Sequence, residues 1–195
     1  MKTVSAIILG AIVMTACAQQ KLGCATLPSG GQYCLQATSA IQPFEAQQKV
    51  EASINGRHET LITEIDVNSN EMNFVGLTPF GQKVVHVRYD NQMVVAETLP
   101  DKRLNPTLIL AMLQLSLWPA DSVRAGLSKS LTLDESVNKR SIHANKKVIM
   151  QVDYVDDSTR YQALKVTLPT VDVKLDIISL PETVPEDEPN IKVAP

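Results

Sequence analysis

The feature that most constrains the fold is a change of hydrophobic period in the middle of the chain. Arg57–Val67 alternates apolar and polar residues, as expected for a strand with one buried face. Residues 106–118 are instead apolar nearly all round, after Asn105 and Pro106, which suit the start of a helix. Because a helix without a polar face must be covered on most sides, the sequence predicts a sheet around a central helix.

Turn residues divide the rest of the chain into extended segments. Asn55-Gly56 is a strong signal for a two-residue hairpin. Strands resume after Ser130, and a second short helix runs from near Pro119 to Gly126. The extended segments recognised individually are 44–54, 57–67, 71–78, 82–89, 93–99, 147–155, 161–168 and 171–177. The predicted fold class is mainly β (α+β), an antiparallel curved sheet or half-barrel of roughly nine or ten strands with a central apolar helical insert.

Two cysteines bracket a turn near the N-terminus. Pro28-Ser29-Gly30-Gly31 lies between Cys24 and Cys34, so the chain can double back and bring the two thiols together. In an oxidising compartment a disulfide is then expected. Two cysteines without nearby histidines make at most half a zinc site, so we predict no metal here.

The first 16 residues have the organisation of a signal peptide. Lys2 is followed by an apolar stretch at residues 4–13, which is too short to span a membrane. Met14-Thr15-Ala16-Cys17 resembles the lipobox of bacterial lipoproteins, which implies that Cys17 is acylated and becomes the first residue of the mature protein. The alternative is a plain secretory signal cleaved near Ala16. By resemblance to lipoprotein sorting rules, Ala18 implies an outer-membrane anchor and a body facing the periplasm.

Charge and motifs argue against two classes of function. After loss of Lys2, 17 basic and 21 acidic residues leave a net charge of −4, whereas nucleic-acid binding requires a basic face. The histidines, His58, His86 and His143, lie in no recognised nucleophile motif. Because the sequence also lacks a zinc helix and a phosphate loop, an enzyme is the least favoured interpretation, and we expect no cofactor.

The sequence predicts four regions. Residues 1–16 form the signal peptide, and residues 17–43 form a lipidated tether with the cysteine loop. Residues 44–178 form one β-rich domain with helices near 105–127. Residues 179–195 hold four prolines and four acidic residues, a composition typical of a disordered tail.

Three segments carry a resemblance to a known family. They are residues 34–36, residues 74–82 (Phe-Val-Gly-Leu-Thr-Pro-Phe-Gly-Gln) and residues 117–127 (Leu-Trp-Pro-Ala-Asp-Ser-Val-Arg-Ala-Gly-Leu). Together they resemble an uncharacterised family of proteobacterial outer-membrane lipoproteins that are often encoded with aryl-polyene biosynthesis genes. The architecture is also similar to that of periplasmic lipoprotein carriers and their outer-membrane acceptor, which hold acyl chains in half-open barrels.

Two non-catalytic functions follow from this sequence. In the first, the protein accepts or carries an apolar ligand (acyl, lipid or polyene) between sheet and helix, beside the membrane that anchors it. The candidate lining residues are Leu61, Ile65, Leu113, Leu117, Trp118, Val148 and Met150. The alternative interpretation of each side chain is a closed, dry core. In the second, the protein is an adaptor that binds an envelope transporter, carrier or enzyme through a sheet edge or the loop at Pro79-Phe80-Gly81.

Overall fold

The computed structural model describes residues 23–101, 104–155 and 161–181. The predicted signal peptide, the predicted lipidation site Cys17 and residues 182–195 of the predicted tail lie outside the described residues. The elements are β1 (Cys24–Thr26), β2 (Gln32–Cys34), η1 (Thr38–Ala40), β3 (Phe44–Ile54), β4 (Arg57–Val67), β5 (Met72–Leu77), β6 (Lys83–Tyr89), β7 (Val94–Thr98), α1 (Pro106–Leu117), α2 (Ala120–Gly126), β8 (Leu131–Ser136), β9 (Lys139–Ala144), β10 (Lys147–Tyr154), β11 (Ala163–Leu168), η3 (Pro169–Val171) and β12 (Val173–Ser179).

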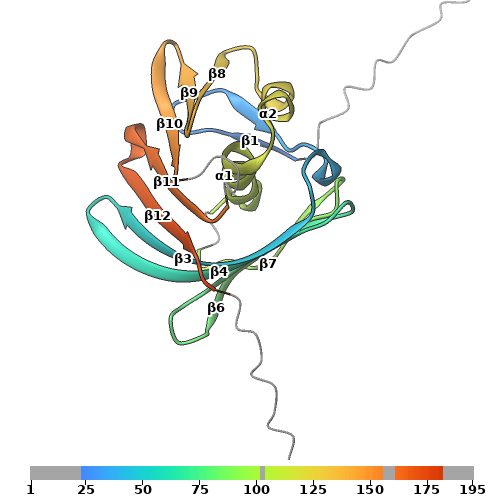
Figure 1. Cartoon of the computed structure of the whole chain (residues 1–195), viewed down its shortest axis with the longest axis vertical. Coiled ribbons are helices and arrows are strands. Elements are labelled where there is room, and N and C mark those ends of the chain that lie inside the picture. Colours follow the sequence, from blue (N-terminus) through green and yellow to red (C-terminus); the bar gives the residue numbers. More distant parts are fainter. Residues whose placement is uncertain (1–22, 102–103, 156–160, 182–195) are drawn as a thin grey trace, which may run out of the picture.

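Ten of the strands form one antiparallel sheet, which confirms the predicted fold class. Their order is β7-β6-β5-β4-β3-β12-β11-β10-β9-β8. The last strand, β12, pairs with β3 and so joins the two meanders that precede and follow the helices. The sheet curves strongly around α1 but does not close, because β7 and β8 remain its two edges (Figure 1).

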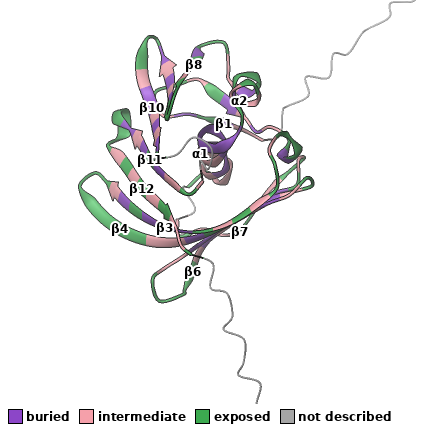
Figure 2. Cartoon of the chain, viewed as in Figure 1, coloured by how far each residue is buried: buried purple, intermediate pink, exposed green. Residues whose placement is uncertain are grey.

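The long central hairpin follows directly from its sequence. β3 and β4 pair along their full lengths, from Phe44 opposite Val67 to Ile54 opposite Arg57. Asn55 and Gly56 both have positive φ, as the predicted two-residue turn requires. On the side facing α1, buried Ile65 and Val67 follow partly buried Leu61 along β4. The hairpin is therefore covered near the start of β3 and exposed near its turn (Figure 2).

The helix start also agrees with the prediction. The Asn105 side chain accepts a hydrogen bond from the Thr107 amide at 2.9 Å, and Pro106 is the first helical residue. Such a cap satisfies one of the amides that have no partner within the helix. α1 thus begins where local chemistry places it, while its position inside the curved sheet comes from packing.

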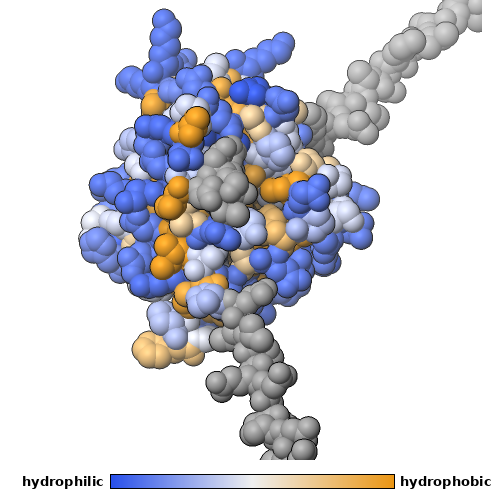
Figure 3. Space-filling view, viewed as in Figure 1, coloured by the Kyte–Doolittle hydropathy of each residue, from blue (hydrophilic) through white to orange (hydrophobic). Residues whose placement is uncertain are grey.

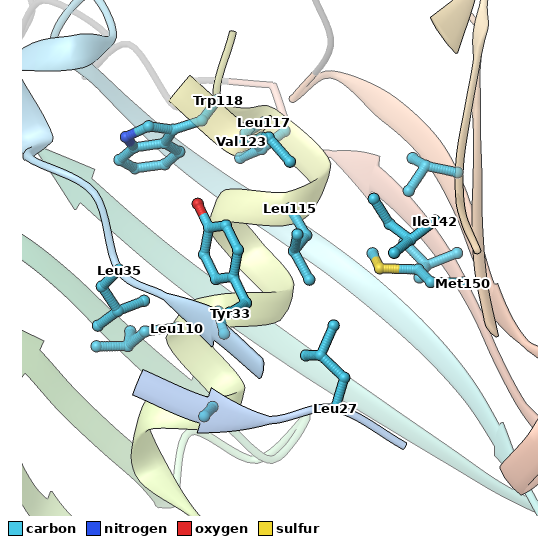
Figure 4. Close-up of a cluster of buried hydrophobic side chains, with 14 of the residues drawn as sticks. Leu27, Tyr33, Leu35, Leu110, Leu115, Leu117, Trp118, Val123, Ile142 and Met150 are labelled. Carbon is cyan, nitrogen blue, oxygen red and sulfur yellow. The ribbon is translucent and has the colours of Figure 1, made fainter. Parts of the chain in front are cut away.

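The cysteine segment belongs to the core and is more than a tether. Cys24 and Cys34 form the predicted disulfide across the β1–β2 hairpin. Ala25, Leu27 and Tyr33 of this segment are almost fully buried. In Figure 4 the β1–β2 hairpin covers one side of α1, while Ile142 and Met150 of the large sheet lie on the other.

Several boundaries differ from the sequence prediction for local reasons. β12 begins at Val173, two residues later than predicted, because Pro169–Val171 forms the 3-10 turn η3 and Asp172 has a φ of 48°. Ser179 is the last residue of β12, and the Leu180 amide donates to the Gln47 carbonyl. The ordered chain therefore continues past the predicted start of the tail.

Candidate functional site: the inner apolar surface

The C-terminal half of α1 is completely enclosed. All five residues from Gln114 to Trp118 are buried. The Gln114 side chain accepts hydrogen bonds from the Tyr33 hydroxyl at 3.1 Å and the Gln36 amide at 2.7 Å, and it donates to the Gln36 carbonyl at 2.9 Å. Burial raises the pKa of the Tyr33 phenol well above its usual range, so Tyr33 stays neutral.

A buried arginine fixes the end of this helix. Arg140 is fully buried and donates to the carbonyl oxygens of Leu115 and Trp118, both at 2.9 Å. It also contacts both carboxylate oxygens of Glu135, at 3.2 and 3.0 Å. Because the last carbonyls of a helix lack partners within it, Arg140 satisfies groups that burial would otherwise penalise.

The N-terminal half of α1 presents a different face. Four apolar side chains on this face are only partly buried: Leu108, Ile109, Met112 and Leu113. They lie on one side of the helix, away from the buried side chains of Leu110, Ala111 and Gln114. This face is therefore apolar but not fully covered by the described residues.

The concave side of the sheet has matching positions. On β12, Val173, Leu175 and Ile177 point to the side facing α1 and are partly buried. The paired residue of Ile177 on β3 is Val50, and that of Val50 on β4 is partly buried Leu61. The inner apolar surface is defined here as Leu61, Leu108, Ile109, Met112, Leu113, Val173, Leu175 and Ile177.

The predicted lining residues divide into three groups: four lie in the closed core, two lie on the inner apolar surface, and Val148 lies on the other side of the sheet. Ile65, Leu117, Trp118 and Met150 are at most 6% exposed and belong to the closed core. Leu61 and Leu113 are partly buried and belong to the inner apolar surface. The sequence interpretation missed the β12 positions, although apolar and polar residues alternate along 171–177 and so give that strand one apolar face.

Val148 lies on the other side of the sheet. It pairs with His143, whereas Met150 pairs with Ile142. His143 and Ile142 are neighbours on β9 and point to opposite faces. A β-bulge between Val148 and Met150 shifts the alternation, so these two candidate lining residues do not share one face, and Val148 does not line the concave side.

A cavity of about 1100 Å³ lies elsewhere, mainly against the outer face of the sheet. Two cross-strand rows contribute to it, Glu45 with Asp66 and Asn73, and Gln47 with Glu64. This open, mixed lining with three carboxylates does not suit an apolar chain. The inner apolar surface is therefore the better candidate for such a ligand, although this cavity is larger than many ligand pockets.

The polar groups of the described chain form no recognisable catalytic centre. His86 lies between Asn73, at 3.0 Å from Oδ1, and Glu97, at 2.8 Å from Oε2, with no serine, threonine or cysteine among these contacts. Among the described residues, no group of three or more His, Cys, Asp or Glu side chains is arranged to hold a metal ion. No described helix is long and apolar enough to cross a membrane.

The fold and the inner apolar surface define a class of protein, an open antiparallel half-barrel with a helix inside its curve. Residues 45–181 match the family described as a protein of unknown function, DUF3261. The chain belongs to this family. No curated protein matches its sequence.

Proposed function

We propose that the protein is an outer-membrane-anchored periplasmic lipoprotein that accepts or carries an apolar ligand in envelope biogenesis. The observation that carries this proposal is the inner apolar surface. Partly exposed aliphatic side chains on α1 and β12 lie inside a sheet that remains open. Contact with an acyl or polyene chain would remove apolar area from water, at about 25 cal/mol per Å².

The location in this proposal comes from the N-terminal sequence. Acylation of Cys17 would hold the protein on a membrane, because several acyl chains together make release negligible. The Ala18 that follows favours the outer membrane, and the resemblance to lipoproteins encoded with aryl-polyene genes favours a polyene among the possible ligands. The intact mass of the mature protein tests the anchor: an unmodified Cys17 or a retained leader contradicts it.

Native mass spectrometry of the full mature protein, extracted from membranes in detergent, tests the ligand. We expect a bound lipid or polyene that survives detergent removal. The Met112→Gln variant should lose most of this occupancy, because it places an amide on the inner apolar surface. Met93→Gln is the matched control, since Met93 is 53% exposed in the turn before β7. An empty wild-type protein that captures no added lipid contradicts the proposal, as does equal occupancy in both variants.

An adaptor function is the second candidate, and one side chain favours it. Phe80 is 98% exposed at the tip of the β5–β6 hairpin, and aromatic residues are enriched at protein interfaces. Figure 3 shows a hydrophobic patch at the lower edge of the molecule among mainly polar surroundings. A photo-crosslinking residue in place of the exposed neighbour Gln82 that recovers one stoichiometric envelope protein, with recovery lost when Phe80→Ser is added, would support this function. Recovery of no protein would count against it.

A further inference from the structure

Thr63 is a buried hydroxyl without a partner on the concave side of the sheet. Its side chain is 3% exposed, and its Oγ1 makes no hydrogen bond to the residues that the structure describes. Buried hydroxyl groups are normally hydrogen-bonded, so an exception of this kind requires an explanation. Threonine rather than valine at this position is therefore unfavourable unless something outside the described chain pairs with the hydroxyl.

The neighbours of Thr63 explain why the hydroxyl is unpaired. Gln48 is opposite it on β3, and Gly76 is opposite it on β5. The Gln48 side-chain amide already donates to the Tyr161 carbonyl. Gly76 has no side chain, so β5 offers nothing to pair with the hydroxyl. The hydroxyl thus lies between a glutamine whose amide nitrogen is already engaged and a glycine over which the Val85 side chain packs.

Thr63 also lies at a boundary of the concave face. Ile65, two residues along β4, is 3% exposed and belongs to the closed core, while Leu61, two residues the other way, belongs to the inner apolar surface. Residues two apart on a strand share a face and lie about 6.6 Å from each other. A chain lying along Leu61 and Ile177 would therefore end next to Thr63, and its end group would reach the enclosed hydroxyl once the side chains that cover Oγ1 move aside.

We infer that the ligand is an acyl compound with a carbonyl group at one end, such as a fatty acid or an acyl ester, and that Thr63 donates a hydrogen bond to this carbonyl oxygen. This inference rests on the proposed function and narrows its ligand class. The apolar part of the ligand would cover Leu61, Leu113 and Ile177. A plain hydrocarbon would fill the same surface but leave the hydroxyl unpaired.

Two fluorescent probes and two variants test the inference. The probes are cis-parinaric acid, a polyene with a carboxyl group, and diphenylhexatriene, a polyene hydrocarbon. Thr63→Val should weaken binding of cis-parinaric acid about 3- to 10-fold, the value of one hydrogen bond, and leave binding of diphenylhexatriene unchanged. Thr63→Ser keeps the hydroxyl and should bind both probes like the wild type.

Thermal unfolding of the unliganded protein supplies an independent readout. Because the hydroxyl has no protein partner, Thr63→Val should unfold at the same temperature as the wild type or higher. A lower unfolding temperature of the Thr63→Val variant overturns the inference. A Thr63→Val variant that weakens binding of both probes equally, or of neither, also overturns it. If the wild-type protein binds diphenylhexatriene at least as tightly as cis-parinaric acid, the carboxyl group adds no affinity. That result overturns this inference alone and leaves the proposed function standing. Wild-type protein that binds neither probe overturns both.

Discussion

The two halves of α1 are similarly apolar but have very different surroundings. From Gln114 onward every side chain is buried, covered by the β1–β2 hairpin on one side and by β8 to β10 on the other. Before Gln114, the face formed by Leu108, Ile109, Met112 and Leu113 is only partly covered. The same composition therefore serves a closed core at one end and an incompletely covered surface at the other.

Under the proposed function, this difference separates stability from ligand binding along one helix. Apolar residues in the closed half are accounted for by packing. Apolar residues in the open half pack against the core on one side but retain contact with water that polar side chains would tolerate better, so packing among the described residues accounts for them only in part. Substitutions in the two halves should consequently affect different measurements.

Trp118→Ala should have the largest effect on stability and would test whether the closed half is as tightly packed as described. Trp118 is fully buried, and its Nε1 donates to the Ala37 carbonyl at 3.1 Å. We expect a loss of about 3–5 kcal/mol in the free energy of unfolding, measured by urea denaturation. A loss below about 1 kcal/mol would show that the hairpin does not cover this end of α1.

Removing the disulfide should have the next largest effect. The Cys24→Ser/Cys34→Ser double variant frees the β1–β2 hairpin, whose closed loop constrains the unfolded chain by about 3 kcal/mol in the loop-entropy model. The same loss should be seen when the wild type is unfolded under reducing conditions. Unchanged stability in both experiments would mean that the hairpin holds α1 without its covalent link.

Substituting one leucine in each half of α1 by alanine gives the closest comparison of the two halves. Leu115 is fully buried and Leu113 is partly buried. We expect Leu115→Ala to cost about 3 kcal/mol and Leu113→Ala about 1 kcal/mol in urea denaturation, because less buried area and a smaller cavity are involved at Leu113. Lipid occupancy should fall for Leu113→Ala and stay unchanged for Leu115→Ala. Equal losses of stability would remove the distinction between the halves.

The smallest predicted effect lies in the turn that adjoins η1. The Asp90 carboxylate accepts from the amides of Met93 and Gln92, and these backbone hydrogen bonds lower its pKa. A carboxyl with a lowered folded-state pKa stabilises the fold above its ordinary pKa and loses this contribution as pH falls through the folded-state value. Asp90→Asn should thus be slightly less stable near neutral pH, and the difference should shrink below about pH 4. A difference that grows in acid would contradict this sign.

The sequence predicted those parts of the fold that local patterns encode. Asn55-Gly56 predicted the central hairpin, and Asn105-Pro106 predicted the start of α1. The strands β8 and β9 were expected only as a general return of strands after Ser130. Their turns contain Asn138 and Asn145, both with positive φ, and asparagine is a common residue in such turns.

The remaining features depend on packing across the chain. β1 and β2 are three residues each, too short for a hydrophobic period, so burial of the cysteine segment against α1 could not be read from it. Val148 and Met150 point to opposite faces of the sheet because a β-bulge lies between them, and the sequence pattern alone does not reveal this bulge. Thr63 looked like an ordinary strand residue, because its lack of a partner is a property of the neighbours that the fold places opposite it.

Intermolecular NOEs between a protonated fatty acid and the methyl groups of the deuterated, methyl-labelled protein test the central claim most directly, because they report only contacts of a few ångströms. We expect NOEs from the acyl chain to methyl groups of Leu61, Leu113 and Ile177, and none to Leu115 or Val123 in the closed half. NOEs to Val75 and Ile178 at the outer cavity, or no specific NOEs, would contradict the assignment of the inner apolar surface as the binding site.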